Sequence, residues 1–139
     1  MIDQASLLGL YARHEAEQER GAYRTYREVL RGVTLGLARD LGFEPEEAET
    51  DALSESVGTW PPFSDTVDSL RRLSRRYRLV ILSNIDNAMF ERTATLLQAD
   101  FAAVITAEQM QSYKPAPRHF EYALASLGIE KGRLLHVAQ

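Results

Sequence analysis

Hydrophobic and polar residues follow only helical periods in the first part of the chain. The strongest pattern covers residues 23–41, where apolar side chains recur every three or four positions until Gly42, a residue type that favours helix ends. Weaker patterns of the same period predict two more helices, over residues 4–20, with Leu7, Leu8 and Tyr11 on the buried face, and over residues 46–57. Together these patterns predict an all-helical domain over residues 1–59.

From about residue 60 onward, segments of helical and strand type alternate. The predicted order is helix 64–76, strand 78–83, helix 86–98, strand 101–106, helix 117–127 and strand 133–138. We expect Ser64 and Asp86 to be the N-caps of the helices 64–76 and 86–98. Pro117 should lie in the first turn of the helix 117–127, and Gly128 should follow its last turn. Such alternation favours parallel strands joined by right-handed crossovers. We therefore predict an α/β domain over residues 60–139, with three parallel strands and flanking helices.

Composition narrows the class of protein. The chain has 139 residues, 45% of them hydrophobic, a net charge of −4 and no cysteine. It can bury a core, while disulfides and thiolate chemistry are excluded. The basic cluster in residues 71–78 is interpreted as the solvated face of a helix rather than a nucleic-acid surface. No apolar run approaches the ~20 residues that span a bilayer, so we expect a cytoplasmic protein without membrane or nucleic-acid partners.

The first candidate site lies where the strand 78–83 ends. Ser83 and Asn84 directly follow its apolar run, at the sheet edge where α/β proteins usually bind ligands. Together with the N-terminus of helix 86–98, they could hold a phosphate or carboxylate oxygen. The alternative is that both residues serve only in an ordinary turn. Asp86 is interpreted as a helix cap rather than a catalytic carboxylate.

The second candidate is Lys114, which stands between Tyr113 and Pro115. The chain has fourteen arginines and only two lysines, so this lysine departs from the general usage of the chain. A compact ammonium group suits the neutralisation of a bound anion or of a nucleophilic aspartate. The alternative is a loop charge in front of a helix-stopping proline.

No residue pattern indicates a metal site. His14, His119 and His136 lie on different predicted elements, without carboxylates at ligand spacing beside them. The sequence also lacks the motifs of a nucleophile elbow, a phosphate-binding loop or a dinucleotide-binding fold. Those enzyme classes can be set aside.

In order and spacing, these segments resemble the haloacid dehalogenase (HAD) superfamily, and most closely its type II 2-haloacid dehalogenase branch. The resemblance covers about residues 60–139, and the helices of residues 1–59 are similar to the cap domain of that branch. The motifs that carry it are Leu82-Ser83-Asn84, the strand type of residues 101–108, Tyr113-Lys114-Pro115 and the segment 134–138. It implies a partial HAD-like Rossmannoid core with an N-terminal α-helical cap.

The resemblance also implies roles for the candidate residues. Ser83 and Asn84 correspond to the motif that binds carboxylate or phosphate oxygens, and Lys114 to the lysine that steadies the nucleophile. A cap arginine would contact a small anionic substrate, either a 2-haloacid or a phosphate ester, and the candidates are Arg13, Arg24 and Arg27. The dehalogenase branch works without a metal ion, whereas phosphatase members of the superfamily use Mg²⁺.

The chain departs from the family's pattern at three points. No strand ending in the nucleophilic aspartate precedes the cap, the last acidic motif would follow Gln139, and Phe120 replaces a tyrosine typical of these dehalogenases. The missing strand is central in the family's sheet, and unpaired backbone groups are costly. We therefore expect a marginally stable monomer, a homodimer, or a chain that takes up a strand from a partner.

The sequence leaves two hypotheses about the function. The leading hypothesis is a HAD-like hydrolase, which in its complete form acts through an aspartyl intermediate, with this chain a fragment that lacks the nucleophile. The alternative is a catalytically inactive module that binds an anion or another protein.

Overall fold

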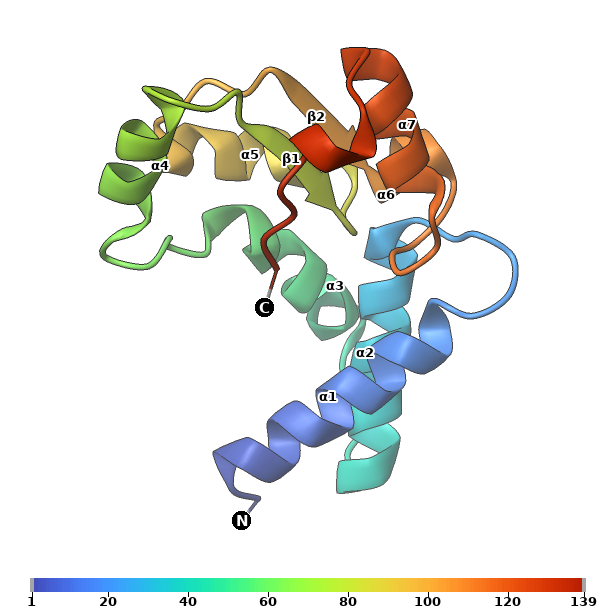
Figure 1. The fold of residues 1–139 in the computed structure, drawn as a ribbon. Coiled ribbons are helices and arrows are strands. Elements are labelled where there is room, and N and C mark those ends of the chain that lie inside the picture. Colours follow the sequence, from blue (N-terminus) through green and yellow to red (C-terminus); the bar gives the residue numbers. More distant parts are fainter. Residues whose placement is uncertain (1, 139) are drawn as a thin grey trace.

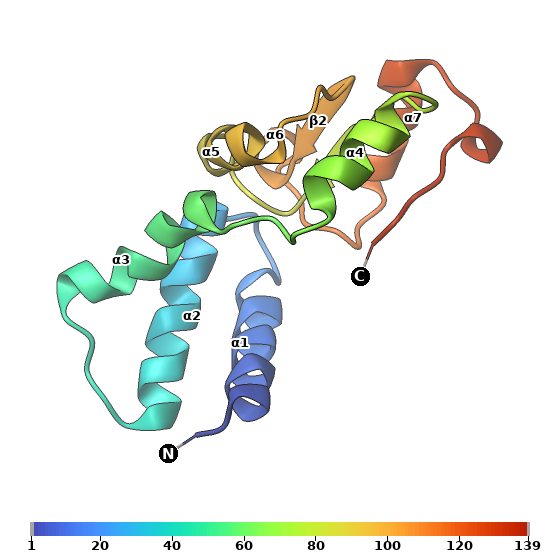
Figure 2. The same cartoon turned by 90° about the vertical axis from the view of Figure 1, so that its left-hand side faces the viewer.

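The N-terminal part of the chain is entirely helical, as its hydrophobic period predicts. In the computed structural model, which describes residues 2–138, α2 packs against both α1 and α3 (Figure 2). A short 3-10 turn then leads into the α/β part of the chain. The elements of this helical part are α1 (Gln4–Gln18), α2 (Tyr26–Leu41), α3 (Glu47–Ser56) and η1 (Val57–Thr59).

Helix α2 is capped at both of its ends. The Thr25 hydroxyl accepts a hydrogen bond from Glu28 N, and the Glu28 carboxylate accepts one from Thr25 N, which completes a capping box. Gly42 ends the helix in a left-handed conformation with φ 73°. The buried face of α2 contains Leu30 and Val33, both without exposed surface, as the period predicts.

The leucines of helix α1 do not mark the face that packs against α2. The prediction that Leu7 and Leu8 are buried is wrong, since their exposed fractions are 38% and 59%, while Tyr11 is half-buried. The buried side chain of α1 is His14, which lies against Gly36 of α2. Hydrophobicity alone does not identify this face because a polar side chain and a glycine make the contact.

The α/β part contains two paired strands. β1 (Val80–Ser83) and β2 (Ala103–Thr106) run parallel, with Val80 opposite Ala103 and Ser83 opposite Thr106. A helix connects the two strands, so the structure confirms the α/β fold class. The other elements of this part are α4 (Thr66–Ser74), α5 (Asn87–Leu97), α6 (Ala107–Met110), α7 (Arg118–Leu127) and η2 (Lys131–Arg133).

The ends of two helices differ in detail from the prediction. Ser64 is not the cap of α4, because a turn in which Thr66 N donates to Phe63 O at 3.0 Å delays the start of the helix to Thr66. Pro117 occupies the N-cap position of α7 instead of its first turn. Gly128 does end α7 in a left-handed conformation, with φ 62°, as predicted.

The third predicted strand is absent from the described residues. The sheet of residues 2–138 has two strands, and residues 134–138 follow η2 as an extended segment that joins neither of them (Figure 1). Leu134 packs against the apolar cluster around Ile105, but Leu135 and Val137 are 85% and 83% exposed. A strand pattern without an adjacent strand has no partner for its backbone groups, and this explains the difference.

The hydrophobic core connects the helical and α/β parts. Its larger cluster joins side chains from α2 and η1 to Met89, Ala107 and Tyr113 of the second part. The division into domains at residue 59 therefore stays a prediction. Helix α4 has no buried residue, and the arginines of residues 71–78 are all exposed, but only Arg71 and Arg72 lie on α4, which ends at Ser74, so the prediction of one solvated helix face holds for these two alone. Within residues 2–138, no helix combines the length and apolar character needed to cross a membrane.

Candidate functional site

The fold brings Asn84 and Lys114 together at the carboxyl end of β1. Lys114 N donates to Asn84 Oδ1 at 2.8 Å, and Asn84 Nδ2 donates to Lys114 O at 3.1 Å. The Lys114 ammonium group donates to Leu82 O, a carbonyl of β1, at 2.6 Å. Two predicted site residues that lie thirty positions apart are thus fixed by reciprocal contacts.

Lys114 is a half-buried cation next to a strand end. Burial lowers the pKa of Lys114 below its usual value, and the negative charge of Glu19 opposes this shift. The hydroxyl of Ser83 has no hydrogen-bond partner among residues 2–138, although Ser83 is half-buried and directly precedes Asn84. An ammonium group and an unbonded hydroxyl at one sheet edge can bind an anionic oxygen.

Glu19 joins this site and was missed by the sequence analysis. It is the C-cap residue of α1, and its pKa is raised to about 7 by burial and by the nearby Glu15. The Asn84 side chain and the charge of Lys114 act on the pKa of Glu19 in the opposite direction. No signal in the sequence links Glu19 to Asn84 and Lys114, because the contact depends on how α1 docks.

Asp86 links the site to the helical part of the chain. It occupies the N-cap position of α5, as predicted, but makes no side-chain bond to that helix. Its two carboxylate oxygens instead accept from Tyr26 N and Arg27 N, each at 2.9 Å, at the start of α2. Asp86 is therefore a cap, but of a helix far away in the sequence.

Aromatic side chains cover the loop before Lys114. Tyr113 stacks on Tyr23 with ring centroids 5.5 Å apart and lies 6.4 Å from the Tyr26 ring. The Tyr113 hydroxyl donates to Arg24 O at 2.8 Å. Burial raises the pKa of Tyr23 to about 12, and its buried hydroxyl has no partner among residues 2–138. These contacts hold the segment between α1 and α2 against the Lys114 loop.

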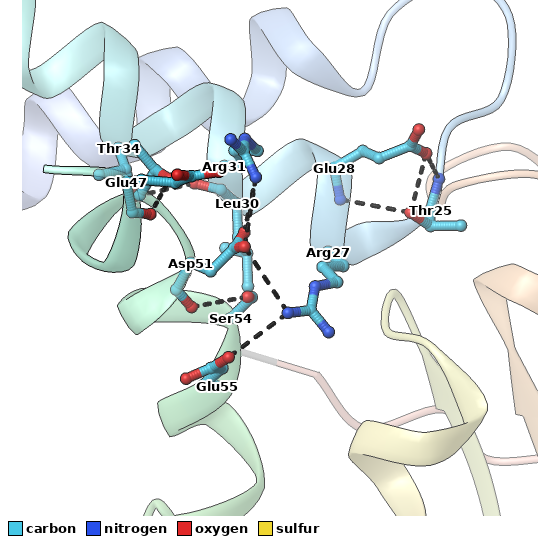
Figure 3. A network of polar contacts seen from close by, with 11 residues as sticks. Thr25, Arg27, Glu28, Leu30, Arg31, Thr34, Glu47, Asp51, Ser54 and Glu55 are labelled. Carbon is cyan, nitrogen blue, oxygen red and sulfur yellow. Dashed lines mark hydrogen bonds and ion pairs between the residues drawn. The ribbon is translucent and has the colours of Figure 1, made fainter. Parts of the chain in front are cut away.

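The three candidate arginines lie in different surroundings. Arg24 donates to Gln18 O at 2.6 Å, next to Glu19, and its backbone contacts Tyr113. Arg27 forms ion pairs with Asp51 and Glu55 of α3, at 3.7 and 3.4 Å (Figure 3). A substrate role for Arg24 stays a prediction, and Arg27 is already paired with carboxylates.

Arg13 belongs to the contact between α1 and α2. It pairs with Asp40 near the end of α2, and His14 Nε2 lies 2.8 Å from the same carboxylate. A hydrogen bond with His14, and the charge of Arg13, hold the pKa of Asp40 below its usual range. Arg13 thus already has a structural partner, and its predicted substrate contact stays a prediction.

The three histidines do not form a metal site in the described part of the chain. His14 is paired with Asp40, His119 is fully buried in α7, and the His136 ring packs edge to face with Phe120, with ring centroids 5.0 Å apart. Burial and the charge of Lys114 lower the pKa of His119, so its neutral form is favoured. Between residues 2 and 138, no three His, Cys, Asp or Glu side chains are arranged to hold a metal ion.

Comparison with curated proteins gives relatives of one kind. A (S)-2-haloacid dehalogenase of Pseudomonas sp. strain YL is 28% identical over 119 residues, covering 84% of this chain and 51% of the relative. The enzyme of the same name from Pseudomonas fluorescens is 26% identical over 121 residues, covering 85% and 53%. The chain thus spans about half the length of the curated relatives it matches.

Comparison with solved structures gives the same fold. The L-2-haloacid dehalogenase of Xanthobacter autotrophicus aligns with a TM-score of 0.76 at 22% identity, covering 90% of this chain and 54% of that one. A defluorinating L-2-haloacid dehalogenase aligns with a TM-score of 0.80 at 18% identity, covering 96% and 58%. The helical part and the α/β part are both included in these alignments.

A match to the model of a protein family covers more of the chain and identifies the family. The model of the haloacid dehalogenase-like hydrolases matches residues 4–137, which is nearly the whole chain. It includes Ser83, Asn84 and Lys114, whose order and spacing predict this superfamily. The chain belongs to the haloacid dehalogenase-like hydrolase family.

Proposed function

We propose that this chain supplies the anion-binding part of a hydrolase that acts on a small 2-haloacid. The proposal is supported above all by the Lys114 ammonium group and the Ser83 hydroxyl at the carboxyl end of β1, held in place by Asn84. The curated relatives are (S)-2-haloacid dehalogenases, which agrees with a carboxylate-bearing substrate. Ser83 and Asn84 then bind the carboxylate oxygens, and Lys114 neutralises charge near the reacting carbon.

The proposed reaction needs a carboxylate nucleophile. In the complete enzyme, an aspartate oxygen attacks the carbon that bears the halogen, and the halide leaves with the bonding electron pair. Water then hydrolyses the resulting ester, which restores the aspartate and releases a hydroxy acid. Asp86 is a poor candidate, because both its oxygens accept bonds from the backbone of α2. The proposed nucleophile therefore comes from a strand beyond those described.

The free edge of β1 offers a place for such a strand. β1 pairs with β2 on one side only within residues 2–138, and Leu135 and Val137, in the segment that follows η2, are exposed. We propose that β1 pairs with a strand from a second copy of the chain or from another polypeptide. Under the same proposal the protein works in the cytoplasm and binds neither a membrane nor nucleic acid, in keeping with its acidic, cysteine-free composition.

A second function would use the same anion site without catalysis. Two observations favour an inactive anion-binding or protein-interaction module: both oxygens of Asp86 are occupied, and one edge of β1 is unpaired. A phosphate ester is the alternative substrate for a hydrolase, since Phe120 replaces the tyrosine of the dehalogenases. Mg²⁺ would be required only for that substrate.

An activity assay with matched lysine variants tests the proposal. The purified chain is given L-2-chloropropionate, or p-nitrophenyl phosphate with and without Mg²⁺, and binding of L-2-chloropropionate is followed by NMR. Lys114→Ala should abolish binding, whereas Lys131→Ala, which removes the other, exposed lysine, should leave it unchanged. Hydrolysis that depends on Lys114 would identify the substrate class.

Each outcome bears on a different part of the proposal. Binding without turnover supports the inactive module or a chain that needs a further strand. Turnover of the phosphate ester alone would replace the dehalogenase proposal. Equal anion binding by the Lys114→Ala chain and the wild-type chain would overturn the proposed site.

A further inference from the structure

The turn that carries Ser83 and Asn84 is anchored by a carboxylate from the end of the neighbouring strand. Glu108 lies in α6, directly after β2, and its Oε2 atom accepts a hydrogen bond from Asn87 N, the first N–H of α5, at 2.7 Å. The Thr106 hydroxyl donates to Asn87 Oδ1, also at 2.7 Å. Because Thr106 pairs with Ser83 in the sheet, these bonds place the Glu108 carboxylate on the turn that carries the anion site.

Glu108 takes an N–H group that an anion could otherwise use. The sequence indicates that the helix after Asn84 contributes its N-terminus to anion binding, but the first N–H group of α5 already donates to this carboxylate. A carboxylate at this position also offsets the positive end of the helix dipole. The turn therefore carries a negative charge of its own beside the proposed anion site.

The charged groups on the turn are unequal in number. A second carboxylate, Asp86, lies in the same turn and accepts from the backbone of α2. The cation of the site is Lys114, which is fixed by its bonds to Leu82 O and Asn84. Neither Glu108 nor Lys114 forms an ion pair among residues 2–138, so no direct contact cancels either charge. Lys114 can neutralise one negative charge of a ligand, and Glu108 opposes a second.

We propose that Glu108 is a specificity-determining residue that makes the site prefer a singly charged anion to a doubly charged one. Lys114 alone would favour the ligand of higher charge, and the Glu108 carboxylate offsets this preference. Its repulsion is proportional to the charge of the ligand, so it opposes a phosphate dianion twice as strongly as a carboxylate. This inference rests on the proposed anion site, and it adds a carboxylate monoanion as the class of substrate.

The test compares two anions of different charge by NMR titration. L-2-chloropropionate carries one charge, and p-nitrophenyl phosphate without Mg²⁺ carries two at pH 8, because the second pKa of a phosphate ester is about 6. The wild-type chain should bind L-2-chloropropionate more tightly. A glutamine oxygen can still accept from Asn87 N, so Glu108→Gln removes the charge and retains the anchor. It should bind the phosphate ester about tenfold and L-2-chloropropionate about threefold more tightly than the wild type.

Matched variants separate local charge from net charge and from anchoring. Glu44→Gln makes the same change in net charge at an exposed position and should leave both dissociation constants unchanged. Glu108→Asp keeps the negative charge and should keep the wild-type order of the two ligands. Amide spectra of each variant establish that the fold is retained.

Three results would overturn the inference. One is a wild-type chain that prefers the phosphate ester. The others are an equal gain for both ligands in Glu108→Gln, or no gain, because a residue that only anchors the turn affects both ligands alike. Binding of L-2-chloropropionate that still requires Lys114 would then leave the proposed function standing. Absence of binding of either anion by the folded wild-type chain would overturn both proposals.

Discussion

Asp86 is the residue that best explains how the two parts of the chain are held together. Its carboxylate is buried and accepts from two successive N–H groups at the first turn of α2. These N–H groups have no partner within their own helix, and the positive end of the helix dipole favours a carboxylate there. Because Asp86 follows Ser83 by three residues, the same short turn presents the anion site and anchors α2.

Removal of the Asp86 carboxylate is therefore expected to destabilise the whole protein. Asp86→Ala leaves the buried N–H group of Tyr26 and the partly buried N–H group of Arg27 without a partner, and we expect the free energy of unfolding to fall by about 2 kcal/mol. Urea unfolding at neutral pH measures this change. Asp100→Ala removes an exposed aspartate as a control and should alter stability by less than about 0.5 kcal/mol. Equal losses in the two variants would contradict a capping role for Asp86.

The site residues differ in how far the sequence can reveal them. Ser83, Asn84 and Lys114 stand at recognisable positions, after an apolar run and in a proline-rich turn, so local patterns suffice to identify them. Glu19 and the true partner of Asp86 are not identifiable in this way. Their roles depend on long-range contacts between the helical part and the strand ends, which no local period encodes.

At the scale of elements, the contact between α1 and α2 shows where hydrophobic periodicity is insufficient. The face of α1 that meets α2 contains His14 and Gln18, and they approach Gly36 and Gly32. Glycines allow two helices to come close, so polar side chains replace the expected leucines. Helix α2, by contrast, follows its period closely because it packs between two neighbours and has a capping box and a terminal glycine.

Two glycine substitutions test this close approach and should have opposite signs. A Cβ at Gly36 would lie 2.5 Å from His14 Nδ1, and the ring is held by its 2.8 Å contact with Asp40. We expect Gly36→Ala to lower the free energy of unfolding by about 2 kcal/mol, despite the better helix propensity of alanine. Thermal or urea unfolding gives the value.

The control is a glycine on the open face of α1. A Cβ at Gly9 would meet no atom within 4 Å, so Gly9→Ala should raise the free energy of unfolding by up to about 1 kcal/mol. If both alanine variants were more stable than the wild type, the helices would not be in close contact at Gly36.

At the scale of the whole molecule, the sheet is the part that the sequence predicts least completely. The alternation of elements correctly indicates an α/β fold, the parallel pairing of β1 with β2 and the crossover helix between them. The segment 134–138 has a strand-like composition but no neighbouring strand within residues 2–138. Composition can report that a segment suits a sheet, whereas pairing requires a second backbone at the right distance.

The open sheet edge leads to a prediction about association. Leu135 and Val137 are exposed large apolar side chains, and all four residues of β1 are only half-buried. Apolar side chains next to an unpaired strand edge favour contact with another chain. We expect the sedimentation coefficient of the purified chain to rise with protein concentration, and its urea unfolding midpoint to rise as well, because association stabilises the folded state.

Charged substitutions distinguish association through this edge from nonspecific association through other exposed apolar residues. Leu135→Glu combined with Val137→Glu should abolish the concentration dependence, since burying two carboxylates in a contact is costly. Phe63→Glu with Trp60→Glu adds the same charge at other exposed apolar residues, of 81% and 49% exposure, and should leave the association unchanged. A wild-type chain that sediments as a monomer at every concentration and unfolds in one sharp transition would show that the edge needs no partner. In that case the proposed uptake of a strand beside β1 would be wrong, while the anion site could still bind its ligand.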